Sequence, residues 1–339
     1  PIPRRQRQMC IRDRTNFKDS NVLITGGLGF IGSNLAQRLV KLGAKVLLVD
    51  SLIPEYGGNL FNIAEIKEQV KVNISDVRDE YSMRYLVQGQ DYLFNLAGQT
   101  SHLDSMHDPY TDLEINCRSQ LSILEACRKY NPDIKLIFAS TRQIYGKPDY
   151  LPVDEKHLVR PVDVNGINKM AGEWYHILYN NVYGIHGAAL RLTNTYGPRM
   201  RVKDARQTFL GIWIKLVVEG KPFEVWGGEQ LRDFTYVEDV IDALLLAAVS
   251  SEANGKIFNL GGDCVISLKD LAEVLIEANG GGEFNIRSFP EERKRIDIGD
   301  YYSDYSLIES VLGWKPQVSL QKGLAQSVEF YRQHLEHYL

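Results

Sequence analysis

Short apolar runs alternate with stretches of helical periodicity along the chain as far as Pro198. The apolar runs predict strands, and the stretches with apolar residues three and four positions apart predict amphipathic helices. Strands separated by helices pair in parallel, so the pattern predicts an α/β fold with a doubly wound parallel sheet and helices on both faces. The strands are expected at 22–24, 46–49, 70–73, 92–96, 135–139 and 186–192, with intervening helices that include 112–130 and 166–179.

After Pro198 the pattern becomes less regular and predicts a smaller C-terminal lobe. Ligands of open parallel sheets bind beyond the carboxyl ends of the strands, so the chemistry is expected directly after the strands of the first part. In the second part, helices are expected at 208–219, 237–249 and 268–278, and short strands at 224–226 and 258–262.

The segment 21–50 contains a strand, a glycine-rich turn, a helix and a second strand that ends in an acid. Gly26 allows a tight turn, Gly29 lets a pyrophosphate approach the backbone, and Gly32 lets the helix lie close to the strand. The free N–H groups at the helix N-terminus attract phosphates. Asp50 stands where a carboxylate accepts hydrogen bonds from the adenosine ribose and repels a 2′-phosphate. The segment therefore predicts a Rossmann-type site for NAD rather than NADP.

The expected domain organisation follows from these elements. Residues 18–198 form the NAD-binding Rossmann domain, which is completed by about 226–262. Residues 199–225 and 263–339 form the substrate-binding lobe. Residues 1–17 are expected to be non-native or disordered. The segment 1–14 is Arg-rich and lacks the apolar region of a secretory signal, so it is not one. It is similar to translated sequencing-adapter read-through, which places the true start at or beyond the first methionine.

Composition excludes several other classes of protein. Of the 339 residues, 44% are hydrophobic and 24% are charged, and the net charge is −4, which is ordinary for a soluble globular protein. There is no basic stripe outside the N-terminus for nucleic acid and no apolar run near the ~20 residues of a membrane span. Four scattered cysteines and seven histidines show no metal spacing, so reduced thiols and no metal are expected. We expect a cytoplasmic protein.

Further motifs resemble those of the extended short-chain dehydrogenase/reductase family, and within it the NAD-dependent nucleotide-sugar epimerases and dehydratases. The resemblance extends from Asn21 to about Phe330, and the order of the motifs is far more specific for the family than for a substrate. The motifs are TGGLGFIG (25–32), DV (76–77), NLAG (95–98), Asn116, ST (140–141), IYG (144–146), Lys169, RLTNTYGPR (191–199), RDFTYVED (232–239) and LGWKP (312–316).

The resemblance implies a cofactor role for a group of residues around the glycine turn. In addition to the three glycines and Asp50, Asp76 and Val77 hold the adenine. The remaining members line the cofactor channel; they are Phe30, Ile31, Asn95, Ala97, Gly98 and Asn116.

The resemblance also implies catalytic and substrate-binding residues. Lys169 binds the nicotinamide ribose and lowers the pKa of a neighbouring acid, and Thr141 bonds the sugar hydroxyl that is oxidised. Asn194 contacts the sugar diphosphate. Arg232 and Arg295 pair with the two phosphates, because a guanidinium group matches the geometry of a phosphate.

One catalytic position departs from the family pattern. The family carries a tyrosine four residues before the lysine, and this chain has Asn165 there. A carboxamide does not titrate in a useful range, and loss of a positioned base typically costs ~10²–10⁴-fold in rate. Three interpretations stay open: a substitute base, a different step such as elimination, or binding of NAD and a nucleotide sugar without turnover.

The substitute base has four candidates in the first of these interpretations. They are Tyr145, Tyr196, His102 and a water molecule held by Asn165. The second interpretation is weakened by another departure, because dehydratases of the family carry an Asp-Glu pair directly after the threonine. Here those positions are Arg142 and Gln143.

The sequence therefore favours an NAD-dependent nucleotide-sugar epimerase, similar to UDP-glucose 4-epimerase, that oxidises its sugar transiently. A nucleotide-sugar dehydratase and a non-catalytic binding protein are the alternatives. The resemblance further implies a homodimer that packs through the helices expected at 112–130 and 166–179.

Overall fold

The computed structural model describes residues 16–262, 264–289 and 297–339. Its centre is a seven-stranded sheet in which all paired strands are parallel. This arrangement confirms the predicted Rossmann-type α/β fold. From one edge to the other the strands are β10 (Ile257–Asn259), β6 (Gly187–Leu192), β5 (Lys135–Thr141), β4 (Tyr92–Asn95), β1 (Asn21–Thr25), β2 (Lys45–Asp50) and β3 (Val70–Ile74).

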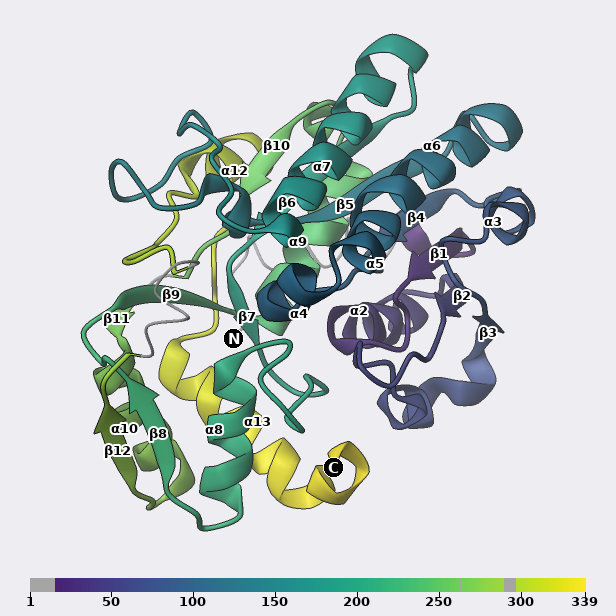
Figure 1. Ribbon diagram of the computed structural model, residues 1–339. Helices are drawn as coiled ribbons and strands as arrows, with labels where there is room; N and C mark the ends of the chain where they lie inside the picture. The colour runs from purple at the N-terminus through teal and green to yellow at the C-terminus, as the bar shows by residue number, and fades with distance from the viewer. Residues whose placement is uncertain (1–15, 263, 290–296) are drawn as a thin grey trace.

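Helices cover both faces of this sheet (Figure 1). One face carries α2 (Phe30–Lys41) and α9 (Val237–Val249), which pack against each other. The other face carries α3 (Glu80–Leu86), α6 (Ser119–Tyr130) and α7 (Val164–Tyr183), with α6 between the other two. Because the sheet is buried on both faces, its strands are continuous apolar runs rather than alternating ones.

A smaller group of elements lies beside the carboxyl ends of the strands (Figure 1). It contains a three-stranded sheet of β11 (Val265–Ser267), β9 (Leu231–Tyr236) and β7 (Asn194–Tyr196), and a two-stranded sheet of β12 (Phe284–Arg287) and β8 (Phe223–Trp226). Its helices are α8 (Phe209–Val218), α10 (Leu268–Asn279) and α13 (Leu320–His334). The two groups share a hydrophobic core, in which Tyr196, Trp213 and Leu324 contribute from the smaller one.

Short helical segments complete the chain. Two of them, α4 (His102–His107) and α5 (Pro109–Leu113), follow β4 and approach the N-terminal end of α7 (Figure 1). The others are α12 (Ser306–Leu312), η1 (Leu60–Gln69), η2 (Glu114–Arg118), η3 (Arg142–Tyr145), η4 (Ser251–Ala253) and η5 (Leu335–Tyr338).

The elements differ from the expected ones mainly near the site. The helix expected at 112–130 is divided into α5, the π-helical turn η2 and α6. The strand β9 and the helices α4 and α13 were not predicted. β9 carries the motif residues Arg232 and Asp233. It lies between two short strands that come from distant parts of the chain. Alternation of apolar and polar residues within β9 is therefore a weak signal for a strand.

Candidate active site

The glycine turn forms one wall of a cavity of about 130 Å³ at the carboxyl ends of β1, β2 and β4. Gly26 has a φ of +67°, the left-handed conformation that glycine adopts without strain. A Cβ on Gly32 would lie 2.3 Å from the carbonyl oxygen of Gly26, so only glycine lets α2 start this close to the turn. The predicted residues on this lining are Gly26, Gly29, Phe30, Ile31, Gly32, Asp50, Asp76, Val77, Ala97 and Gly98.

Asp50 lines this cavity beside the glycine turn and is bonded to it. Its Oδ2 accepts a hydrogen bond from the N–H of Leu28 at 3.0 Å, and its Oδ1 accepts one from the N–H of Leu52 at 2.9 Å. Burial raises the pKa of the Asp50 carboxyl, although the two N–H donors act in the opposite direction. Each carboxylate oxygen keeps acceptor capacity for a further donor. The carboxylate is therefore fixed for hydroxyl donors such as those of a ribose.

A larger cavity of about 700 Å³ adjoins the first. The residues that line both are Phe30, Ile31, Leu96, Gly98, Thr100 and Gln207, so the two cavities adjoin along these residues. The lining of the larger cavity includes Thr141, Asn165 and Lys169, and it includes Asn194 and Arg232 from the side of the smaller sheets. The fold thus brings together residues that lie far apart in the chain.

Lys169 lies at the junction of the two cavities. It is buried on α7, its Nζ lies 3.3 Å from the carbonyl oxygen of Ala139, and its charge lies over the ring of Phe138. Burial lowers its pKa to about 8. A Cβ on Gly98 would lie 2.8 Å from this Nζ and 3.0 Å from Oδ1 of Asn116. A donor and an acceptor therefore converge at the glycine that lines both cavities.

Two of the predicted cofactor residues lie behind the cavity surface rather than on it. Asn95 is fully buried, accepts a hydrogen bond from Thr25 and donates one to Gln120. Asn116 donates to the carbonyl oxygen of Gln99 at 2.9 Å, and its Oδ1 has no partner among the described residues. The expectation that Asn95 lines the channel thus differs from the structure, which gives it the task of joining β1, β4 and α6.

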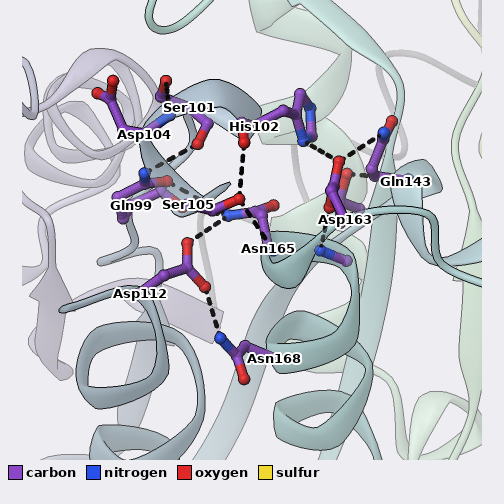
Figure 2. Close-up of polar contacts among 12 residues, drawn as sticks. Gln99, Ser101, His102, Asp104, Ser105, Asp112, Gln143, Asp163, Asn165 and Asn168 are labelled. Atoms are coloured by element: carbon purple, nitrogen blue, oxygen red, sulfur yellow. Dashed lines mark hydrogen bonds and ion pairs between the residues drawn. The ribbon is translucent and has the colours of Figure 1, made fainter. Parts of the chain in front are cut away.

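Asn165 belongs to a network of amides around one buried carboxylate. Asp112 is fully buried on α5, and it accepts hydrogen bonds from the side-chain amides of Asn165 and Asn168 at 3.1 and 2.8 Å (Figure 2). The side-chain amide of Asn116 donates a third, at 3.0 Å. Asn165 also donates to the carbonyl oxygen of Gln99 at 2.8 Å. The π-helical turn η2 directly follows α5 and contains Asn116, and a distortion of this kind is frequent at functional sites.

The two tyrosines considered as substitute bases lie outside the cavity. Tyr145 is fully buried, donates to Oδ1 of Asn259 at 2.7 Å and accepts from Arg191 at 2.6 Å. Burial raises its pKa to about 12. Tyr196 is buried as well, and its hydroxyl donates to the carbonyl oxygen of Leu320 at 3.3 Å. No tyrosine is present among the described residues that line the larger cavity.

His102 does line the larger cavity, and it faces a carboxylate that the sequence did not single out. Its Nδ1 lies 2.9 Å from Oδ2 of Asp163, the N-cap residue of α7 (Figure 2). The signal for Asp163 was its place directly before the helix, where aspartate is a preferred cap. His102 and Asp163 are separated by sixty-one positions in the chain, and only the packing of α4 on α7 brings them together.

Guanidinium groups form the opposite side of the larger cavity. Arg142 directly follows Thr141; its Nη2 donates to Oδ1 of Asn194 at 3.0 Å, and its buried Nη1 has no partner among the described residues. Arg232 is held by the carbonyl oxygens of Leu231 and Gly299. Burial, together with the charge of Arg142, lowers the pKa of Arg232 to about 10. Arg295 lies outside the described residues.

The chain belongs to the NAD dependent epimerase/dehydratase family, whose model matches residues 22–261. The chain is 30% identical to UDP-glucose 4-epimerase of Mycolicibacterium smegmatis over 91% of this chain and 98% of that protein. It is 29% identical to dTDP-glucose 4,6-dehydratase of an Actinoplanes strain, over 92% and 97% of the two chains. The crystal structure of UDP-glucose 4-epimerase of Thermotoga maritima with UDP-glucose has a TM-score of 0.85, at 31% identity over 93% of this chain and 99% of that one.

Membership of this family makes the protein an NAD-dependent enzyme that acts on carbohydrates. The smaller cavity fits NAD, because a Cβ-free cradle at the start of a helix faces a fixed carboxylate. Among the described residues, no group of three His, Cys, Asp or Glu side chains is placed to hold a metal ion. No described helix is both long and apolar enough to cross a membrane.

Proposed function

We propose that the protein is a nucleotide-sugar epimerase, similar to UDP-glucose 4-epimerase, that acts by transient oxidation of the sugar. The observation that carries this proposal is that the two cavities adjoin, with Lys169 next to Gly98, which lines both, and with Thr141 on the lining of the larger one. NAD supplies the hydride acceptor and donor when it is bound in the smaller cavity. The sugar then occupies the larger cavity, with its reacting carbon next to the residues of the junction.

Individual residues have distinct tasks in this proposal. Gly26, Gly29 and Gly32 leave room for the pyrophosphate of NAD at the start of α2, and Asp50 binds the adenosine ribose. Asp76 and Val77 face the adenine. The positive Lys169 binds the nicotinamide ribose and favours the loss of a proton from a nearby hydroxyl. The Thr141 hydroxyl accepts a bond from the N–H of Gln143 at 3.2 Å and stays free to donate to the sugar.

The cationic side of the larger cavity suits a diphosphate. We propose that Arg232 pairs with one phosphate and that Asn194, fixed by Arg142, contacts the diphosphate as well. We retain Arg295 as a candidate for the second phosphate, on the resemblance alone. The division into an NAD-binding domain (18–198, with about 226–262) and a substrate lobe (199–225 and 263–339) follows the same distribution of tasks.

A dehydratase and a non-catalytic binding protein agree less well with the residues of this site. A dehydratase needs acids directly after Thr141, and Gln143 at that place is buried and donates to Oδ2 of Asp163 at 2.9 Å. A non-catalytic binding protein would give no task to the Thr141 hydroxyl, which lines the larger cavity and stays able to donate. We therefore favour turnover over binding alone, and epimerisation over water loss.

We also propose a homodimer in the cytoplasm. The outer face of α5 and α7 exposes a continuous set of apolar side chains, Tyr110, Leu113, Ile167, Trp174, Leu178 and Val182, each between 40% and 78% exposed. Large apolar patches of this kind mark protein–protein contacts. Among the described residues Cys117, Cys127 and Cys264 are free thiols, which suits a reducing compartment.

A panel of substrates tests the proposed activity. Purified protein is incubated with UDP-, dTDP-, GDP- and CDP-sugars, and the products and the NADH absorbance are followed. We expect one sugar nucleotide to be converted to its epimer with a transient rise in NADH. Release of a dehydrated product would show that the protein is a dehydratase and would overturn the proposal. Binding of NAD and sugar nucleotide with neither product nor NADH would replace it by the binding protein.

A further inference from the structure

The described lining of the larger cavity offers few groups that can take a proton from a sugar hydroxyl. It contains no tyrosine or cysteine, and its proton acceptors are His102, Asp104, Lys169, Glu224 and Asp297. The position at which the family carries its base is occupied by Asn165, whose amide is committed to Asp112 and Gln99. The base must therefore come from this short list or from water.

Three of these groups are carboxylates that already face an arginine. Asp104 lies 3.1 Å from Arg206, and Asp297 lies 3.5 Å from Arg232. Glu224 lies 3.1 Å from the guanidinium of Arg287. Each of these carboxylates is thus engaged by a guanidinium group rather than free to face a sugar hydroxyl. Lys169, with a pKa of about 8, carries its proton at neutral pH. His102 is the remaining group.

The surroundings of His102 orient its ring. Its Nδ1 lies 2.9 Å from Oδ2 of Asp163, whose side chain is fully buried, whereas the side chain of His102 is 39% exposed toward the cavity. Asp163 is itself fixed, because its Oδ1 caps the N–H of Gly166 at 2.7 Å and its Oδ2 accepts from Gln143. The Nδ1 atom makes no hydrogen bond of normal geometry to Asp163, but a carboxylate this close attracts a proton to Nδ1 by its charge. Nε2 is then the ring nitrogen that can accept a proton.

A chain of hydrogen bonds ties His102 to the place of the missing tyrosine. The Ser105 hydroxyl donates to the carbonyl oxygen of His102 at 2.7 Å and accepts from the N–H of Asn165 at 3.2 Å (Figure 2). The start of α4 is thus fastened to the first turn of α7. The imidazole of His102 and the amide of Asn165 line the same cavity from these two adjacent helix ends.

We propose that His102 is the general base and acid of this enzyme, that it touches the reacting sugar hydroxyl, and that Asp163 is its positioning residue. The proposal rests on the proposed redox function. When the sugar is oxidised, its O–H bond breaks and the proton goes to Nε2 of His102, while the C–H bond gives its hydrogen and two electrons to the nicotinamide oxidant, so that a ketone forms. Return of the hydride and of the proton from Nε2 restores an alcohol of either configuration.

The first test compares two histidine variants of the complete protein. His102→Gln keeps a polar side chain but cannot take the proton, so we expect kcat to fall ~10²–10⁴-fold. Dissociation constants for NAD and for UDP, measured by calorimetry, should change less than about threefold, since neither affinity depends on the base. His107→Gln alters an exposed histidine five residues later on the same helix and should retain the activity. Equal activity of His102→Gln and wild type would overturn the proposal.

The second test examines Asp163 without turnover. Asp163→Asn keeps a side chain able to cap α7 but removes the charge that faces His102. Nitrogen NMR of histidine-labelled protein, with the signals of His102 assigned by their loss in His102→Gln, reports which ring nitrogen carries the proton. We expect Nδ1–H in the neutral ring of the wild type and a loss of this preference in Asp163→Asn, together with a kcat at least tenfold lower at unchanged KM. An Nε2–H ring in the wild type would contradict the proposal.

The pH profile separates this proposal from the proposed function. The charged groups around His102 are Asp163 and Lys169 from α7, Asp112 from α5, and Asp104 with Arg206 on its own side of the cavity. A base that is protonated loses activity, so kcat/KM of the wild type should fall at low pH and this fall should be absent in His102→Gln. If the wild type converts no sugar nucleotide, the proposed function fails. If it does so and the variant retains the fall, only the assignment to His102 fails.

Discussion

Asn165 replaces the catalytic tyrosine of the family, and it has a structural task of its own. Its amide satisfies the buried carboxylate of Asp112, which Asn168 and Asn116 also bond. A tyrosine at this position would carry no side-chain amide to bond Asp112. The asparagine and the buried aspartate therefore form one unit, and the change from the family pattern concerns the whole network rather than a single side chain.

The side-chain amide of Asn165 now lies 3.1 Å from Oδ2 of Asp112. Replacing Asn165 by aspartate would put a second carboxyl group next to that of Asp112. Two buried carboxylates cannot both ionise without a large cost, so we expect about 2–4 kcal/mol of lost stability at neutral pH. The loss should shrink in mild acid, when the pair takes up a proton. Urea unfolding at several pH values measures it. Asn181→Asp at the exposed end of α7 is the control, and an equal loss there would contradict the argument.

The buried charge of Lys169 is expected to lower the stability of the protein while it is required for activity. Burial lowers its pKa to about 8 from an ordinary 10.5, so the folded protein pays for the charge below about pH 8. Between pH 8 and 10.5 the unfolded chain holds the proton that the folded one has lost, and stability gains with rising pH.

Lys169→Met should therefore stabilise the cofactor-free protein at pH 7 by roughly 2–4 kcal/mol while it abolishes turnover. The gain over wild type should become smaller as the pH rises toward 10. Chemical denaturation across this range is the measurement, with Lys41→Met on the exposed end of α2 as the control. A gain that is independent of pH would show that the lysine charge is not its source.

At the scale of elements, the strand–turn–helix unit of β1 and α2 sets the cofactor site through backbone contacts. The close approach of Gly32 to the carbonyl oxygen of Gly26 involves backbone on both sides, so neither partner can rotate away. By contrast, a Cβ on Gly27 would meet side-chain atoms of Leu48 first, at 2.8 Å, and such a neighbour can adjust.

Gly32→Ala should consequently weaken NAD binding at least tenfold and reduce stability by about 1–3 kcal/mol, because the helix start must move away from the turn. Gly27→Ala in the same turn is the matched control and should lose less of both. Calorimetric titration with NAD and thermal unfolding measure the two effects. Equal losses in both variants would show that the turn as a whole, and not the contact at Gly32, limits cofactor binding.

At the scale of the whole molecule, the apolar face of α5 and α7 predicts the assembly state. Trp174 is 52% exposed and Leu178, one turn further on, is 49% exposed. A stripe of this kind along a helix suits packing against a second copy of the same face.

Trp174→Glu should shift the protein from dimer to monomer and raise the dissociation constant at least tenfold, because a charge would be buried at the centre of the contact. Light scattering after size-exclusion chromatography measures the mass. Ile286→Glu, at a side chain that is 51% exposed on β12 in the smaller lobe, should leave the mass unchanged. A monomeric wild type, or a dimer that tolerates Trp174→Glu, would contradict this interface.

The sequence by itself determined the fold class, the family and the outline of the cofactor site. These features depend on residues that are neighbours in the chain, since the glycine turn, the start of α2 and Asp50 all lie within one strand–helix–strand unit. Local periodicity also predicted most strands of the large sheet. It missed β9, whose partners come from distant short segments, and it did not predict the π-helical turn that contains Asn116.

Only the tertiary structure decided which groups share the cavity. Tyr145 and Tyr196 had the right chemistry for a base, but packing buries them against Asn259 and Leu320. Nothing in the sequence indicates that His102 and Asp163 are in contact, because the contact forms only where α4 packs against the start of α7. The glycine turn that binds the cofactor is formed by neighbouring residues, so the sequence predicts it. Whether a side chain can act as a proton acceptor depends on its distance from the substrate, its burial and its hydrogen-bond partners, which come from several elements.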